Sequence, residues 1–331
     1  MDILAALGLV LLGLALLAAG GEALVRAATT LAQLAGVSPA VIGLTVVAIG
    51  TSLPELVVSL VAATGGEPDL AVANVVGSNI FNIAATLGLT ALIIPLPVHG
   101  SAVKLEWPVM FAASFLCLLL ARDGHIDNLE GGFFLVSLLL FIAYTVHVAR
   151  TDVGKAEAGQ LAEHVESRDI DVGERPRSSA RKLLVTIAVL VVGVGALVVG
   201  GRLLVEGAIA LARLAGLTER VIGLTIVAGG TGAPELATSL IAAYRKRTDV
   251  AVANMIGSNI FNVLGILGVT ALITPIPVAP ALVRSDMWWM IGTALLMLPV
   301  LRSQARISRA EGGVLLAVYL TYLATLLRPG G

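Results

Sequence analysis

The sequence contains little of what most metal sites and soluble surfaces are made from. Its 331 residues include one cysteine, four histidines and only 13% charged residues. A single cysteine, Cys117, excludes an internal disulfide and a cysteine-ligated metal site. The histidines (His99, His125, His147 and His164) lie in loops or near the ends of apolar runs, which argues against zinc, copper or iron bound deep in the chain. Soluble domains carry about 25% charged residues, so a soluble protein is also excluded.

Long apolar runs dominate the chain, which is 57% hydrophobic. The runs are about 20 residues long and do not alternate, so they predict membrane-spanning helices. The net charge of −1 says nothing about nucleic acid, and no basic patch suggests it, so no nucleic-acid partner is expected. We predict an all-α polytopic membrane protein, with the lipid bilayer as partner and an N-terminal span that is not a cleaved signal. Ten spans are expected, at about 2–20, 38–64, 70–94, 104–121, 131–149, 183–201, 219–244, 249–273, 285–301 and 311–327.

A polar stretch at 150–182 separates the fifth and sixth spans. Its acidic residues are candidate calcium ligands, but a mixed run of charges is more typical of a solvated linker. Most of the 21 lysines and arginines fall on the linker side of the predicted spans, which places the linker in the cytoplasm and the N-terminus outside. The chain is therefore expected to consist of a first half (1–149), the linker (150–182) and a second half (183–331).

The two halves carry the same pattern. Val41–Leu60 reads VIGLTVVAIGTSLPELVVSL and Val221–Leu240 reads VIGLTIVAGGTGAPELATSL, an offset of 180 residues with 14 of 20 positions identical. AVANVVGSNIFN at Ala71–Asn82 returns as AVANMIGSNIFN at Ala251–Asn262. Corresponding spans are five apart, an odd number, so the copies cross the membrane in opposite directions. The prediction is two inverted-topology five-helix repeats, with an ion site near the midplane where they meet.

Each copy places a Pro-Glu pair, Pro54-Glu55 or Pro234-Glu235, inside apolar sequence. A proline removes a backbone donor, so helices two and seven are expected to be broken there and to expose carbonyl groups. Carbonyls, hydroxyls and carboxylates are the oxygen ligands that hard cations prefer. The candidate ligands in these two segments are Ala48, Thr51, Ser52, Glu55, Ala228, Thr231 and Glu235.

The GSNIFN segments add polar side chains at helical spacing. Ser78 and Asn82 are four residues apart and share a helix face, as do Ser258 and Asn262. In hydrocarbon such residues either hydrogen-bond between helices or line a cavity. Alone they favour the first interpretation, but their repetition beside the Pro-Glu segments favours the second.

The positions of the acidic residues reduce the number of candidate charged ligands. Of 22 acidic residues, only Glu55 and Glu235 lie deep in apolar sequence, with no lysine or arginine nearby. A carboxylate inside hydrocarbon costs at least about 2.5 kcal/mol, so it indicates function. Two carboxylates carry a charge of −2, which one Ca²⁺ would neutralise. Cations, protons or both are the expected partners.

These motifs resemble the two alpha-repeats of the cation/Ca²⁺ antiporter superfamily, in its prokaryotic sodium/calcium exchanger branch. The resemblance implies a core formed by spans two, three, seven and eight, against which spans one and six slide. It also implies cation ligands from the positions that match the family motifs: Ala48, Thr51, Ser52, Glu55, Ser78, Asn82, Ala228, Thr231, Glu235 and Ser258. Two positions depart from the family pattern: Asn262 stands where many relatives have aspartate, and Gly232 where they have serine.

The resulting functional prediction is a secondary antiporter that extrudes Ca²⁺ in exchange for Na⁺, working as a monomer and without a cofactor. Antiport of Ca²⁺ against H⁺ remains an alternative, because two carboxylates suffice for proton coupling. Asn262 and Gly232 also lack oxygen ligands that the family pattern has at these positions. An intramembrane protease is disfavoured, because no histidine or aspartate lies deep in a predicted span. A channel is disfavoured by the inverted broken helices, which favour alternating access. The protein is therefore not expected to be an enzyme.

Overall fold

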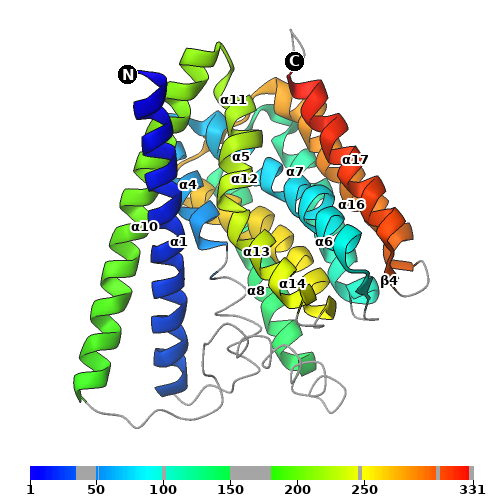
Figure 1. Ribbon diagram of the computed structural model, residues 1–331, viewed down its shortest axis with the longest axis horizontal. Coiled ribbons are helices and arrows are strands. Elements are labelled where there is room, and N and C mark those ends of the chain that lie inside the picture. The colour runs from blue at the N-terminus through cyan, green and yellow to red at the C-terminus, as the bar shows by residue number, and fades with distance from the viewer. Residues whose placement is uncertain are drawn as a thin grey trace.

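The computed structural model describes residues 1–34, 50, 52–98, 102–149, 180–244, 248–302 and 306–327, which form a bundle of helices (Figure 1). The predicted linker at 150–182 lies outside the described residues except for its last three, which begin a helix. In the described part of the chain, six helices are long and apolar enough to cross a membrane. The chain is thus a multi-pass membrane protein. These spans are Ile3–Leu31, Pro68–Ile93, Val103–Asp123, Asn128–His147, Leu183–Ala215 and Asn254–Ile273.

The remaining predicted spans are divided or short in the structure. The segment at 219–244 is split into α11 (Glu219–Ile222), η5 (Gly223–Val227), α12 (Ala228–Thr231) and α13 (Ala233–Tyr244). Of the segment at 38–64, the structure describes Gly50 and the residues from Ser52 onward, with α4 at Leu53–Thr64. The last two predicted spans correspond to α16 (Met287–Arg302) and α17 (Arg309–Leu326).

Two long helices, α1 (Ile3–Leu34) and α10 (Ala180–Ala215), lie side by side at one edge of the bundle (Figure 1). Their backbones approach so closely that a Cβ added at Gly13 would lie 2.7 Å from the Leu204 nitrogen, and one at Gly20 would lie 2.8 Å from the Gly193 oxygen. Because contacts move down α10 as they move up α1, the two helices are antiparallel. Small residues at such a contact permit close packing in a membrane, where burial of apolar surface gives no driving force.

Two segments form the centre of the bundle. The first consists of α5 (Pro68–Ile80), η2 (Phe81–Leu87) and α6 (Gly88–Ile93), and the second of α14 (Thr248–Ile260), η6 (Phe261–Leu267) and α15 (Gly268–Ile273). About 78% of the apolar window of each is buried, against 22% for α10. Both η2 and η6 are π-helical and begin at the phenylalanine of GSNIFN. Such wide turns occur often at functional sites.

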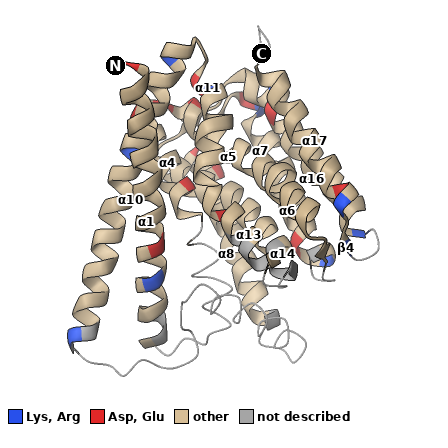
Figure 2. Ribbon diagram, in the orientation of Figure 1, with Lys and Arg blue, Asp and Glu red and all other residues tan. Residues whose placement is uncertain are grey.

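The other helices surround this centre. The elements packed against the central segments are α4, α13, α16 and α17 together with η3 (Ala102–Glu106), α7 (Trp107–Leu120), α8 (Asn128–Ala149) and η7 (Leu282–Asp286). The short helix η4 (Ala121–Asp123) follows α7 and packs against it. Buried apolar side chains form one large cluster around the central segments and a smaller one between α1, α10 and α4. Charged residues gather mostly at the helix ends, but acidic residues also lie beside α4 and α13 in the middle of the bundle (Figure 2).

Among the described residues, four two-residue strands connect the halves at the helix ends, an addition to the predicted all-helical fold. β1 (Leu96–Pro97) pairs antiparallel with β4 (Arg306–Ile307), and β2 (His125–Ile126) pairs antiparallel with β3 (Ile276–Pro277). β1 and β3 occupy matching positions in the two halves, as do β2 and β4. Each pairing therefore joins one half of the chain to the other.

Candidate cation site

Glu55 and Glu235 occupy equivalent places, each in the first turn of a helix that begins inside the bundle. α4 begins at Leu53 and α13 at Ala233, so the prolines stand at the second helical position, where their missing N–H costs nothing. Both side chains are buried, with 1% and 0% of their surface exposed. In the seventh predicted span, the single residue Gly232 separates α12 from α13.

The two carboxylates lie close enough to interact electrostatically, and each has a hydroxyl from the opposite half beside it. Ser52 Oγ donates a hydrogen bond to Glu235 Oε1 at 3.4 Å. The Thr231 hydroxyl is next to the Glu55 carboxylate. Each half thus places one hydroxyl beside the carboxylate of the other half, as expected for a two-fold repeat.

Asn74 of α5 connects α4, which carries Glu55, with α12, which carries Thr231. Its Nδ2 donates to the Glu55 carbonyl at 3.3 Å and to Ser59 Oγ at 3.0 Å, which holds α4 against α5. Its Oδ1 accepts a hydrogen bond from Thr231 Oγ1 at 3.3 Å. Sequence analysis missed Asn74, although its repetition as Asn254 in the AVAN segments was a signal.

Four asparagines from GSNIFN form a reciprocal cluster where η2 and η6 begin. Asn82 Nδ2 donates to Asn259 Oδ1 and Asn262 Nδ2 donates to Asn79 Oδ1, both at 3.0 Å. Asn79 and Asn259 in turn donate to each other's backbone carbonyls at 3.4 and 3.1 Å. The cluster, called here the asparagine clasp, uses the amide donors of Asn82 and Asn262 and leaves their oxygens free for another partner.

Several buried oxygens near this point have no hydrogen-bond partner among the described residues. A buried acceptor without a partner costs about 1–3 kcal/mol, so a group of them indicates a binding site. Their helices meet, because α4 packs against η6 and α13 packs against η2. The unpartnered atoms are Glu55 Oε2, Ser78 Oγ, Asn82 Oδ1, Ser258 Oγ and Asn262 Oδ1.

The donor set consists of two carboxylates and neutral oxygens. In the described part of the chain, no group of three or more histidine, cysteine, aspartate or glutamate side chains is placed to hold a metal. Two carboxylates with amide and hydroxyl oxygens suit a hard cation such as Ca²⁺ or Na⁺. The residues present therefore fit the cations that the sequence predicts.

Two of the predicted ligands are not described by the structure, and a third has a hydrogen-bond partner. Ala48 and Thr51 lie outside the described residues. The Ala228 carbonyl, expected to be freed by the proline, accepts a hydrogen bond from the Gly232 nitrogen at 3.0 Å. The carbonyl whose helical donor Pro234 removes is that of Gly230, two residues further along the chain.

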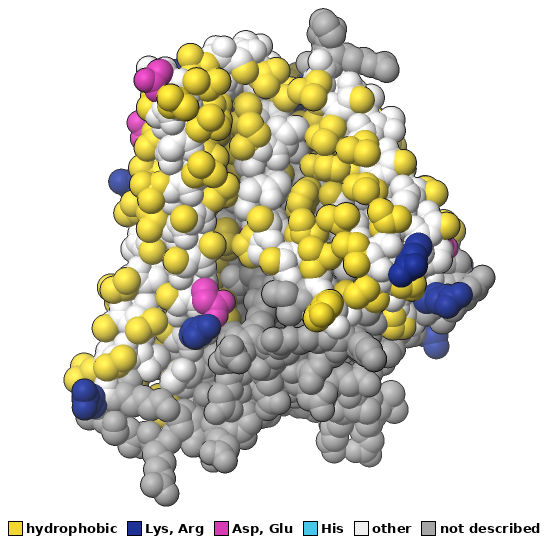
Figure 3. Space-filling view, viewed as in Figure 1, with side chains coloured by type: hydrophobic (Ala, Val, Ile, Leu, Met, Phe, Trp, Pro, Cys, Tyr) yellow, Lys and Arg dark blue, Asp and Glu magenta, His cyan; other side chains and the backbone are white. Residues whose placement is uncertain are grey.

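A cavity of about 540 Å³ reaches this site from the side of α1. It is lined by α1 from Leu14 to Val25 and by the two Pro-Glu segments, including Pro54, Pro234 and Thr231. Its lining is mostly apolar, and hydrophobic side chains cover most of the middle of the adjoining face of the molecule (Figure 3). The cavity thus connects the surroundings of Thr231 with the contact between α1 and the central helices.

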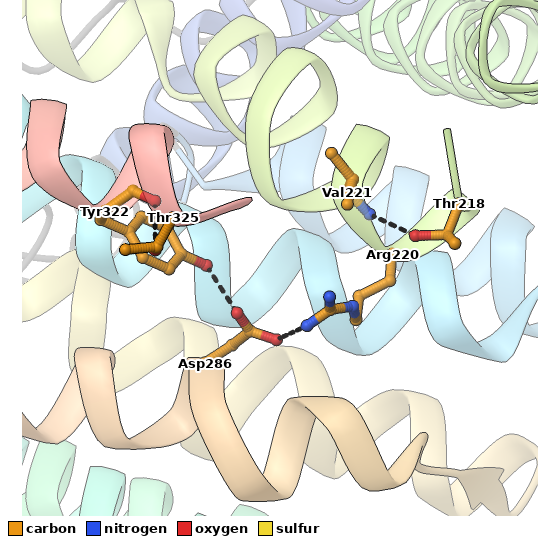
Figure 4. Close-up of polar contacts among 6 residues, drawn as sticks. All are labelled: Thr218, Arg220, Val221, Asp286, Tyr322 and Thr325. Carbon is orange, nitrogen blue, oxygen red and sulfur yellow. Dashed lines mark hydrogen bonds and ion pairs between the residues drawn. The ribbon is translucent and has the colours of Figure 1, made fainter. Parts of the chain in front are cut away.

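A second buried polar network lies at the end of the bundle where α11 begins (Figure 4). Arg220 Nη1 contacts Asp286 Oδ2 at 2.6 Å, and the Tyr322 hydroxyl donates to Asp286 Oδ1 at 3.2 Å. All three side chains are buried. The network ties α11, which leads into the segment carrying Thr231 and Glu235, to η7 and α17. Asp286 stands at the start of the predicted span 285–301, and nothing in the sequence indicates that Arg220 is its partner.

This arrangement of paired helices around buried oxygens is that of a multi-pass membrane transporter. The sodium/calcium exchanger protein family profile matches residues 5–148 and 185–328. The chain is 32% identical to the sodium/calcium exchanger MaX1 of Methanosarcina acetivorans, over 96% of this chain and 97% of that protein. It is 35% identical to the inner membrane protein YrbG of Escherichia coli, over 98% and 97%.

Solved structures agree with the sequence relatives. A structure of the sodium-calcium exchanger NCX_Mj, soaked with Na⁺ and Sr²⁺, superimposes with a TM-score of 0.64 at 30% identity, over 99% of this chain and 100% of that one. The chain belongs to the sodium/calcium exchanger family. It is a member of a transporter family and not an enzyme, as the sequence predicts.

Proposed function

We propose that this protein exchanges Ca²⁺ for Na⁺ across the cytoplasmic membrane and normally extrudes Ca²⁺. The observation that carries the proposal is the pair formed by Glu55 and Glu235, which are buried, adjacent and related by the repeat. A dehydrated Ca²⁺ needs several oxygens and compensation of two positive charges. The pair supplies the charge, and the unpartnered oxygens around it replace water.

The proposed ligands follow from this geometry and from the family motifs. Side-chain oxygens come from both halves, and carbonyl oxygens come from the two broken helices. Asn262 contributes a neutral amide oxygen, so the site keeps a charge of −2. The proposed set is Glu55, Glu235, Thr51, Thr231, Ser52, Ser78, Ser258, Asn82, Asn262, Ala48 and Ala228.

The proposed architecture is ten spans in two inverted five-helix halves, with a cytoplasmic linker and an external N-terminus. The antiparallel packing of α1 on α10 and the reciprocal strand pairings support it. So does the match of the family profile to two separate halves. In this arrangement the site lies near the midplane, and sliding of the α1–α10 pair would open it to one side at a time.

Coupling to H⁺ in place of Na⁺ is the second candidate, and one structural observation favours it. At Gly232, where the family pattern has serine, an added Cβ would lie 3.0 Å from the Phe81 ring and 3.0 Å from the Ala228 oxygen. A serine here would require the Phe81 ring to shift by a few tenths of an ångström. The native chain therefore lacks one hydroxyl ligand that the family pattern supplies.

Flux measurements decide between the two candidates. Purified protein is reconstituted in vesicles loaded with Na⁺, diluted into Na⁺-free buffer containing ⁴⁵Ca²⁺, and measured with and without a protonophore. Na⁺ coupling predicts uptake that depends on the Na⁺ gradient and persists with the protonophore. Uptake that follows an imposed pH gradient without Na⁺ would establish H⁺ coupling. Absence of Ca²⁺ flux under both gradients would contradict Ca²⁺ as the substrate.

A further inference from the structure

A second hollow lies between α7 and α16, on a side where apolar side chains are exposed, and it shares no residue with the cation site. It has a volume of about 530 Å³ and contains two arginines, Arg122 and Arg284. α7 and α16 pack against each other, and the Trp107 indole of one donates to the Ala294 carbonyl of the other at 2.7 Å. The full lining is Phe115, Leu118, Leu119, Arg122, Val283, Arg284 and Trp288.

Neither arginine has an ion pair or hydrogen bond among the described residues, and both are exposed. The nearest acids in sequence are engaged elsewhere. Asp123 Oδ1 accepts a hydrogen bond from the His125 nitrogen at 3.2 Å. Asp286 is bonded to Arg220 and Tyr322. Two guanidinium groups thus lie in one hollow without a protein counter-ion. Their combined positive charge favours binding of an anion.

The apolar lining continues from the arginines along both helices. Leu118 and Phe115 lie about one and two turns before Arg122, and Trp288 lies one turn after Arg284. About half of the Phe115, Leu119 and Trp288 surfaces is exposed. Tryptophan at a span end is typical of the membrane interface. The hollow therefore has a cationic end at the interface and an apolar body that extends toward the hydrocarbon.

We propose that this hollow binds an anionic phospholipid. The phosphate would lie between Arg122 and Arg284, since guanidinium groups bind phosphate through paired hydrogen bonds. An acyl chain would lie against Phe115, Leu119 and Trp288. A soluble anion would use the two arginines but not the apolar body, so the combination selects a lipid. The lipid site is independent of the transported ion.

Tryptophan fluorescence provides the test, because Trp288 lies in the hollow. The full-length protein is reconstituted in phosphatidylcholine vesicles containing a small fraction of lipid with brominated chains, either phosphatidylglycerol or phosphatidylcholine. Brominated phosphatidylglycerol should quench the emission preferentially, with a preference of roughly fivefold for each arginine. Unlabelled phosphatidylglycerol should reverse this quenching. Equal quenching by the two brominated lipids would overturn the proposal.

Variants locate the effect. The R122Q/R284Q double variant should lose the preference, and W288F should lose the selectively quenched part of the emission. R213Q removes an exposed arginine at the end of α10, outside the hollow, and should behave as the native protein. Preference retained by the double variant, or lost equally in R213Q, would contradict the site. Displacement by soluble glycerol phosphate at the same concentration would assign it to a soluble anion instead.

Discussion

Asn79 and Asn259, which stand 180 residues apart, donate side-chain hydrogen bonds to each other's backbone carbonyls. The same two side chains accept hydrogen bonds from Asn262 and Asn82. The asparagine clasp therefore fixes which way two proposed cation ligands point, although Asn79 and Asn259 are not among those ligands. It also joins the two halves of the chain directly beside the proposed site.

Removing the Asn79 side chain from the asparagine clasp should weaken Ca²⁺ binding without unfolding the protein. In N79A, the Asn262 amide loses its acceptor and no longer holds its oxygen toward the site. We expect the KM for Ca²⁺ to rise roughly 10–100-fold, as for other residues that orient metal ligands, with a smaller change in kcat. N128A is the control, because Asn128 donates to the Ala271 and Leu272 carbonyls at a helix end. An equal KM change in both variants would show that the clasp is only structural.

Neutralising either central carboxylate should abolish exchange. E55Q or E235Q halves the charge available to Ca²⁺, and loss of one partner in a buried charge pair costs about 3–5 kcal/mol, which is at least roughly 100-fold. Initial rates of ⁴⁵Ca²⁺ uptake check this, with E22Q as the control, since Glu22 is a half-exposed residue paired with Arg26. Substantial transport by both site variants would disprove the ligand assignment.

Asn262→Asp should keep Ca²⁺ transport but make it sensitive to protons. Aspartate at this position can donate to Asn79 Oδ1, now 3.0 Å from the amide nitrogen, only while it carries a proton. As the pH rises the proton leaves, the hydrogen bond is lost and a third negative charge enters the site. Activity between pH 6 and 8 should therefore differ in shape from that of the native protein. Superimposable profiles would refute the prediction.

The buried pair of Arg220 and Asp286 should show strong coupling in stability. R220M leaves Asp286 buried without its cation and should destabilise the protein by about 3–5 kcal/mol. Adding D286N, which keeps the contact with Tyr322, should recover much of this loss. Unfolding midpoints of the two single variants and the double variant measure the coupling. The exposed pair of Glu22 and Arg26 provides the comparison, for which about 0–1 kcal/mol is expected. Additive effects at Arg220 and Asp286 would contradict the assigned contact.

A covalent link between α10 and α4 should stop exchange and leave Ca²⁺ binding intact. Cysteines at positions 201 and 57 are suitable, because a Cβ on Gly201 would lie 2.9 Å from Val57 Cγ1. The native Cys117 is buried and does not compete. Oxidation should block ⁴⁵Ca²⁺ uptake, and a reducing agent should restore it in the same sample. Unchanged uptake in a verified cross-linked sample would rule out sliding of α10 on the central helices.

The sequence predicts the two buried carboxylates because their signals are local. A proline beside a glutamate inside an apolar run predicts an interrupted helix and a buried charge, and Glu235 is buried in the first turn of α13. The asparagine clasp could not be predicted in the same way. Its contacts depend on how η2 and η6 cross, and no local pattern fixes the register of two helices 180 residues apart.

Other features escaped prediction for related reasons. Arg220 and Asp286 stand near span ends, where charged residues are ordinarily solvated, and only the packing of α11 on η7 shows that they are buried together. The π-helical turns at Phe81 and Phe261 leave no mark in composition, since they add one residue per turn to a pattern that still looks helical. The Ala228 carbonyl keeps its helical hydrogen bond, because Pro234 removes the donor for the carbonyl of residue 230 and not for that of residue 228.

The strand pairings have a consequence for how such a chain could arise. β1 and β3 are equivalent, as are β2 and β4, and the two pairings are β1 with β4 and β2 with β3. Each of these strands thus pairs with a strand of the other half. The two pairings are equivalent, because exchanging the halves turns one into the other. A protein consisting of one half alone could make both of them by associating with a second copy of itself about a two-fold axis. Joining two such subunits in one chain would preserve this interface, so the present chain has the strand contacts expected of a fused two-fold dimer.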